Sequence, residues 1–175
     1  CNDEAFAFDC YRRLIQMYGE VVMQIRPERF LSHLDHVMAQ KGAKAERELT
    51  ADDWRDVVTT YKQIVLAETS EPFPQDPVIQ LLGAVRAVFD SWFNPRADVY
   101  RKHHNLPDSP GTAVNVQQMV FGNMTGASGT GVLFTRNPAT GEKMLYGEFL
   151  SHAQGEDVVA GIRTPRPLTQ LQADH

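Results

Sequence analysis

Four glycines in residues 122–131 are the first feature with chemical potential, because their backbone N–H groups could surround an anion such as a phosphate. The segment lacks both the GxxxxGK[ST] and the GxGxxG pattern, and we expect it to join two strands rather than to begin a helix. Two interpretations therefore stay open. The segment is either a structural hairpin turn or a mobile loop that covers a ligand.

A group of carboxylates follows the glycines. Glu148, Glu156 and Asp157 could hold Mg²⁺ together with a substrate phosphate, because hard cations take oxygen ligands. Solvated surface acids are the alternative explanation. Arg136 and Arg163 could neutralise phosphate charge, although an arginine at the end of a strand is commonly a surface ion-pair partner. The residue types alone decide neither question.

Cysteine and histidine offer no recognisable metal or nucleophilic site. The two cysteines have no CxxC spacing, and Cys10 falls on the apolar side of an expected helix, which predicts a buried and inert thiol. His33 and His36 are three positions apart in another expected helix, and His103 and His104 are adjacent. No third ligand accompanies either pair, so we expect structural or surface roles.

The composition bounds the class of protein. The chain has 175 residues, of which 22% are charged and 42% hydrophobic, as in one or two ordinary globular domains. A net charge of -5 argues against a broad electrostatic surface for nucleic acid. No apolar run approaches the roughly 18 residues that a membrane-spanning helix needs, and the first residues lack the features of a signal peptide. We therefore expect a cytoplasmic protein with neither nucleic-acid nor membrane partners.

Residues 1–105 are expected to form a subdomain of four helices, followed by a shorter helical piece that reaches His104. Apolar residues recur there every three or four positions, which is typical of amphipathic helices. Local signals mark where the helices begin. These signals are Asp3, Pro27, Thr50 with Asp53, and Asp76 with Pro77.

Each expected helix carries an apolar stripe that should face the core, with Trp54 and Trp92 as anchors. In the first helix the stripe is Phe6, Cys10, Leu14, Met17, Tyr18, Val21 and Ile25. In the fourth helix the stripe is Val78, Leu81, Leu82, Val85, Phe89 and Trp92.

A loop at residues 105–111, rich in Pro, Asp, Ser and Gly, separates the helices from a β-rich part. Strands are predicted at residues 112–121, 131–136 and 143–150, joined by turns in an antiparallel meander. The predicted class is therefore α+β, with a helical subdomain at 1–105 and a second domain at 106–175.

Long motifs in this chain resemble a known family. The segment GTAVNVQQMVFGNMTGASGTGVLFTRNPATGEKMLYGEFLSHAQGEDVVAGIRTP is similar to the N-terminal nucleotide-binding domain of pyruvate, phosphate dikinases, and FDCYRRLIQMYGEVVM is similar to its helical part. The resemblance implies that residues 106–175 are part of an ATP-grasp lobe. It implies conversion of ATP, pyruvate and phosphate to AMP, phosphoenolpyruvate and diphosphate, with Mg²⁺ and a monovalent cation. The resemblance also implies that the phosphoryl group travels on a histidine of a separate domain and that the parent enzyme is a homodimer.

The resemblance also implies roles for particular residues. Backbone groups near Gln118, Met119 and Val120 would contact adenine, the Met119 side chain would line its pocket, and Glu148 would lie beneath the nucleotide. The family's phosphate-clamping lysine and arginine belong to a segment before Cys1, and its metal-holding Asp-x-Glu and Gln-x-Arg strands come after His175. We therefore expect an internal piece of a dikinase that binds nucleotide weakly and is inactive alone, with no catalytic residue and no metal ligand assigned.

Two alternatives remain at this stage. A dikinase of the phosphoenolpyruvate synthase type shares the phosphohistidine chemistry but uses water as its second phosphoryl acceptor. A non-catalytic interaction module would use the helices to dock on a partner and the β part as scaffold.

Overall fold

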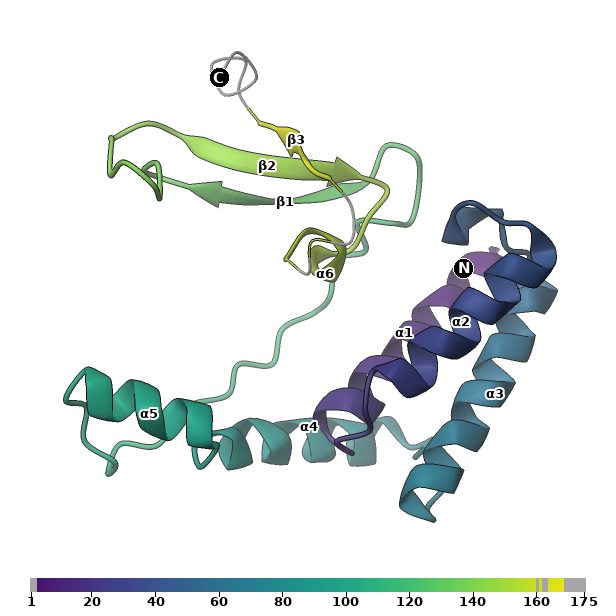
Figure 1. Ribbon diagram of the computed structural model, residues 1–175, viewed down its shortest axis with the longest axis horizontal. Coiled ribbons are helices and arrows are strands. Elements are labelled where there is room, and N and C mark those ends of the chain that lie inside the picture. Colours follow the sequence, from purple (N-terminus) through teal and green to yellow (C-terminus); the bar gives the residue numbers. More distant parts are fainter. Residues whose placement is uncertain (1–2, 160, 162–163, 169–175) are drawn as a thin grey trace. The chain divides into compact units, whose positions relative to one another are not determined.

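A computed structural model describes residues 3–159, 161 and 164–168 of the chain (Figure 1). The chain divides into two compact units, Cys1–Val116 and Gln117–His175, and each is described by itself. Helices dominate the first unit and a small antiparallel sheet lies in the second, so the predicted α+β class is confirmed. The functional division predicted at residue 105 stays a prediction. Among the described residues, no helix has both the length and the apolar character needed to cross a bilayer.

The N-terminal signals of the helices are confirmed. Helix α1 (Glu4–Val21) is capped by Asp3, whose Oδ1 accepts a hydrogen bond from the Phe6 N–H at 3.0 Å. Helix α2 (Glu28–Lys41) follows Pro27 and ends at Gly42 with φ 65°, a conformation that glycine adopts without strain. A short 3₁₀ turn (Glu46–Glu48) leads to α3 (Ala51–Thr69), where Thr50 and Asp53 form the predicted capping box.

Helices α1, α2 and α3 pack around one apolar core (Figure 1). Near its centre the Phe30 and Tyr61 rings lie 4.9 Å apart, and the Tyr61 hydroxyl donates to the Phe30 carbonyl at 3.1 Å. This bond satisfies the polar end of a fully buried tyrosine. The buried apolar members of the core are Ile15, Tyr18, Ile25, Phe30, Leu34, Leu49, Trp54, Val57, Val58, Tyr61, Val65 and Phe73.

The stripe predicted for the first helix is partly wrong. Met17 is 50% exposed and Val21 65%, whereas Ile15 is fully buried. The core face of α1 also includes Arg12, whose guanidinium pairs with Asp9 and Glu46 and lies 4.8 Å from the centre of the Trp54 ring. A stripe drawn from apolar residues alone could not include this buried charge. Cys10, predicted to be buried, is half-buried.

Helix α4 (Pro77–Ser91) begins where predicted, and Asp76 caps it by accepting from the Val78 N–H at 2.7 Å. Its predicted stripe does not face a core within the first unit, since α4 has no buried residue. Val78 is 60% exposed and Leu82 62%. The helix approaches α1 instead through Gly83, where an added Cβ would lie 2.2 Å from the Tyr18 hydroxyl oxygen. Contact through a small residue leaves the large apolar side chains on another face.

The second unit contains strands β1 (Gly129–Phe134), β2 (Tyr146–Ser151) and β3 (Arg166–Pro167), paired antiparallel in the order β1-β2-β3. The predicted antiparallel arrangement is confirmed, with β1 and β2 close to the strands predicted at residues 131–136 and 143–150. The strand predicted at residues 112–121 is wrong, because none of those residues belongs to a strand, and β3 was not predicted. Alternating residues do not form a strand without a partner for their backbone groups. The short helix α6 (Gly155–Val159), which the sequence analysis did not predict, contacts β1 and β2.

Candidate functional site

The glycines of residues 122–131 are explained largely by close contacts within the second unit. An added Cβ on Gly131 would lie 2.6 Å from the Glu148 carbonyl oxygen, and one on Gly129 would lie 2.8 Å from the Leu150 carbonyl oxygen. A Cβ on Gly122 would lie 2.2 Å from the Ala153 carbonyl oxygen. Only Gly126 among these four has open space around it. This geometry favours the structural-turn interpretation over a dedicated phosphate loop.

Three predicted site residues lie in an extended segment, residues 112–120, that belongs to no helix or strand. Met119 is 53% exposed and Val120 90% exposed, and Gln118 is also exposed. No backbone–backbone hydrogen bond connects residues 112–120 to other described parts of the chain. Within the described residues, other main-chain groups therefore do not engage their backbone donors and acceptors, and such groups can bind a ligand when water is excluded.

Glu148 lies in the middle of β2, opposite Val132 on β1 and Pro167 on β3. Its side chain is exposed, and it forms no ion pair or side-chain hydrogen bond with another described residue. Glu148 and residues 117–120, the last part of the extended segment, belong to the second unit, and in the described part of the chain no backbone–backbone hydrogen bond joins them. The arrangement offers one carboxylate on a rigid strand and one open stretch of backbone.

The suggested carboxylate group does not assemble into a metal site. The Oδ2 of Asp157, which is 6% exposed, accepts from the Gln154 N–H at 2.8 Å at the start of α6. Within the described residues, no three His, Cys, Asp or Glu side chains gather closely enough to hold a metal ion. The described residues thus offer no preassembled set of three ligands for a magnesium ion. Arg136 donates to the Gly141 carbonyl at 3.1 Å in the β1–β2 turn, and Arg163 lies outside the described residues.

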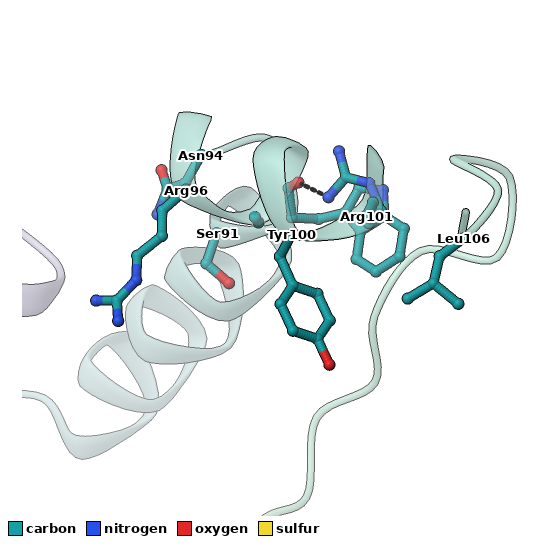
Figure 2. Close-up of a pocket in the computed structure, with 8 residues that line it drawn as sticks. Ser91, Asn94, Arg96, Tyr100, Arg101 and Leu106 are labelled. Atoms are coloured by element: carbon teal, nitrogen blue, oxygen red, sulfur yellow. Dashed lines mark hydrogen bonds between the residues drawn. The ribbon is translucent and has the colours of Figure 1, made fainter. Parts of the chain in front are cut away.

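A separate hollow of about 420 Å³ lies in the first unit beside α4 and α5 (Pro95–His103) (Figure 2). Arg101 lies 4.3 Å from the centre of the Trp92 ring, donates to the Trp92 carbonyl at 2.6 Å and pairs with Asp108 at 2.8 Å. Its charge is thus used to hold the end of α4 against α5. The predicted anchor Trp54 is buried, while Trp92 is half-buried against this arginine. We assign the hollow no role in nucleotide chemistry.

The second unit also contains a buried polar pair, Asn123 and Gln154, that sequence patterns did not predict. Gln154 is 4% exposed and Asn123 7%, and the Gln154 side-chain amide donates to Asn123 Oδ1 at 3.0 Å. The partners are separated by 31 positions along the chain, so local spacing could not have paired them. The density of glycines around Asn123 is the only local sign that the backbone is crowded there.

Comparisons with known proteins place these features in a family. Residues 76–174 match the family model described as "Pyruvate phosphate dikinase, AMP/ATP-binding domain". A pyruvate, phosphate dikinase of Rhizobium meliloti (strain 1021) is 56% identical over 97% of this chain and 19% of its own length. One from Clostridium symbiosum is 55% identical over 97% of this chain and 20% of its length. The chloroplastic pyruvate, phosphate dikinase 1 of Zea mays is 56% identical over 98% of this chain and 18% of its own length. The chain thus spans about a fifth of the length of these relatives.

Proposed function

The chain belongs to the family of the pyruvate phosphate dikinase AMP/ATP-binding domain, and on this premise we propose that it forms part of the nucleotide-binding domain of a pyruvate, phosphate dikinase. The observation that carries the proposal is the match over residues 76–174, which includes both the 112–120 segment and Glu148. The proposed parent reaction converts ATP, pyruvate and phosphate to AMP, phosphoenolpyruvate and diphosphate through a phosphohistidine on another domain.

In this proposal, backbone groups of residues 118–120 bind the adenine edge and the Met119 side chain covers the base. The open backbone of the segment supports that role, because adenine offers a donor and an acceptor that main-chain groups can match. Glu148 would accept from a ribose hydroxyl or face the phosphates from its position on β2. A rigid strand is a suitable platform for such a contact.

Magnesium enters the proposal only as the ion that accompanies the phosphates of ATP, because Mg²⁺ commonly takes phosphate and water ligands with few protein carboxylates. We expect the 175-residue chain alone to bind ATP weakly without turning it over. Phosphoryl transfer needs positioned cations, and the described residues assemble no metal-ligand group.

The proposal extends to partners and location. The partners are ATP and the remaining domains of a homodimeric parent enzyme, with neither nucleic acid nor membrane among them. We propose a cytoplasmic location, although the Zea mays relative is chloroplastic.

Isothermal titration calorimetry of the chain with ATP and Mg²⁺ tests this proposal. We expect a dissociation constant in the range of about 0.1 to 5 mM, which corresponds to roughly 3–5.5 kcal/mol of binding free energy. Met119→Ala should weaken binding several-fold. Met17→Ala is the matched control, because Met17 is 50% exposed, as Met119 is 53%, but lies on α1. Absence of binding at about 10 mM ATP would instead favour the non-catalytic interaction module.

A further inference from the structure

The bend at residues 152–154, directly after β2, holds the turn at residues 122–128 by its backbone. The Ala153 N–H donates to the Gly122 carbonyl at 3.0 Å, and the His152 N–H donates to the Ser128 carbonyl at 2.7 Å. The two bonds attach the bend to both ends of the turn. We call these residues, 122–128 together with 152–154, the clasp.

Side chains add two further links to the clasp. The Gln154 amide donates to Asn123 Oδ1 at 3.0 Å in a buried position, and His152 Nδ1 lies 3.1 Å from the Thr125 carbonyl oxygen. Gln154 is held in turn by its own N–H, which donates to Asp157 Oδ2. A buried amide pair with its partners in place is rigid, because losing either partner leaves a desolvated polar group.

The bend adopts a backbone conformation that side chains disfavour. His152 has φ 48°, in the left-handed region. Its own N–H and that of Ala153 are both hydrogen-bonded to the turn, which holds the backbone in this conformation. Strained backbone of this kind persists where surrounding contacts determine it, and it is frequent in binding regions.

The clasp is the nearest anchor of the proposed adenine-binding segment. Residues 112–120 make no backbone–backbone hydrogen bond to other described residues, whereas Gly122, two positions after Val120, is bound by the bend. The bend continues directly from β2, which carries Glu148. The clasp therefore sets where residues 118–120 lie relative to Glu148.

We propose that the clasp positions residues 118–120 for the nucleotide and that Gln154 is a positioning residue of this site. The inference rests on the proposed function, since it names the device that places the adenine-binding segment. Gln154 does not itself contact the ligand in this account. It acts through Asn123.

The first test measures backbone order in the ligand-free chain by ¹⁵N NMR relaxation. We expect Gln154→Leu to lower the amide order parameter of Val120 and Phe121 from near 0.85 to below about 0.6. Asn137→Ala is the matched control. Asn137 Oδ1 accepts from the Ala139 N–H at 2.9 Å in the β1–β2 turn, at the other end of the hairpin, so its loss should leave Val120 unchanged.

The second test measures the ATP dissociation constant of the same variants. Gln154→Leu should raise it about tenfold, and Asn137→Ala should not change it. The double variant Asn123→Gln/Gln154→Asn keeps an amide pair of the same combined length and should restore both the order and the affinity. If Gln154→Leu fails to fold, the single variant Asn123→Gln takes its place in the test. Asn123→Gln should lower the order at Val120 and weaken ATP binding, and the double variant should restore both.

The outcomes separate the two proposals. Unchanged order at Val120 in Gln154→Leu overturns the clasp inference, and so does lost order with an unchanged ATP affinity. If the unaltered chain binds no ATP, the proposed function has failed, and the order parameters still decide whether the clasp orders the segment.

Discussion

The two units of the chain are ordered by different kinds of contact. In the first, large side chains such as Phe30, Val57 and Tyr61 are fully buried between helices. In the described part of the second, the buried apolar side chains are only Leu150 and Ala153, and they are accompanied by buried Asn123, Gln154 and Asp157. Apolar burial stabilises the helices, whereas close backbone approach and polar bonds hold the hairpin and the clasp.

The two units should therefore lose stability through different kinds of substitution. An apolar core loses stability in proportion to the volume removed, and a polar, glycine-dependent unit loses it when a Cβ or an unpaired polar group is introduced. Helix α4 provides an internal reference, since its large apolar residues lie outside the core of the first unit. Three pairs of substitutions, each a test variant with its control, probe these contacts from the largest expected effect to the smallest.

Phe30→Ala should lower the free energy of unfolding of the first unit by about 3–5 kcal/mol, because it empties a fully buried site against Tyr61. Phe89→Ala on α4 is the matched control, since Phe89 is 48% exposed, and it should cost less than about 1 kcal/mol. Urea unfolding followed by far-ultraviolet circular dichroism measures both. Equal losses would show that α4 is buried in solution and would contradict the contrast.

Gly131→Ala should destabilise the second unit by about 1–3 kcal/mol, because the new Cβ would lie 2.6 Å from the Glu148 carbonyl oxygen across the hairpin. Gly126→Ala has open space and no positive φ, so it should be neutral or slightly stabilising. Thermal unfolding monitored by NMR signals of β1 and β2 separates this unit from the helices. A tolerated Gly131→Ala would mean that the strands can move apart at no cost.

The smallest expected effect is a pH dependence of the first unit. Lys41 Nζ lies 2.6 Å from Asp53 Oδ1. This contact, together with hydrogen bonds from Thr50, lowers the pKa of Asp53 to about 2. Since the folded pKa is below the unfolded value, the stabilisation is complete above about pH 4 and is lost as the pH falls toward 2. We expect only a small loss of stability, because the Lys41 side chain is 55% exposed and solvent screens the pair.

Urea unfolding at pH 5, 4, 3 and 2 measures this dependence. Asp53→Asn should remove it, and Asp52→Asn should retain it, because the Asp52 side chain is 85% exposed and its ion pair is with neighbouring Arg55 rather than with Lys41. If the free energy of unfolding of both variants depends on pH in the same way, the pH dependence does not arise from Asp53.

Sequence patterns correctly predicted the features that depend on residues close together in the chain. Caps and prolines located α1, α3 and α4 correctly, because Asp3, Thr50 with Asp53, and Asp76 satisfy backbone groups only a few positions away. The burial of Arg12 was not predictable from helical spacing, since it depends on Glu46 and Trp54, which are distant along the chain.

In the second unit the local pattern was a weaker guide. Alternating residues at 112–121 predicted a strand, but no strand in the described part of the chain pairs with their backbone groups. The third strand of the meander, β3, has only two residues and carries no periodicity to detect. The candidate residues Gln118, Met119, Val120 and Glu148 came from the family resemblance, and their roles stay predictions. Gln154 became visible only when its bond to Asn123 was known.

The central claim, that residues 118–120 and Glu148 contact adenine nucleotide, is tested most directly by an NMR titration of the ¹⁵N-labelled chain with ATP. We predict chemical-shift changes at the amides of residues 118–120, at Glu148 and in the clasp, with saturation at millimolar ATP and little change in α1, α2 and α3. Changes confined to the helices of the first unit, or none at about 10 mM ATP, would contradict the account.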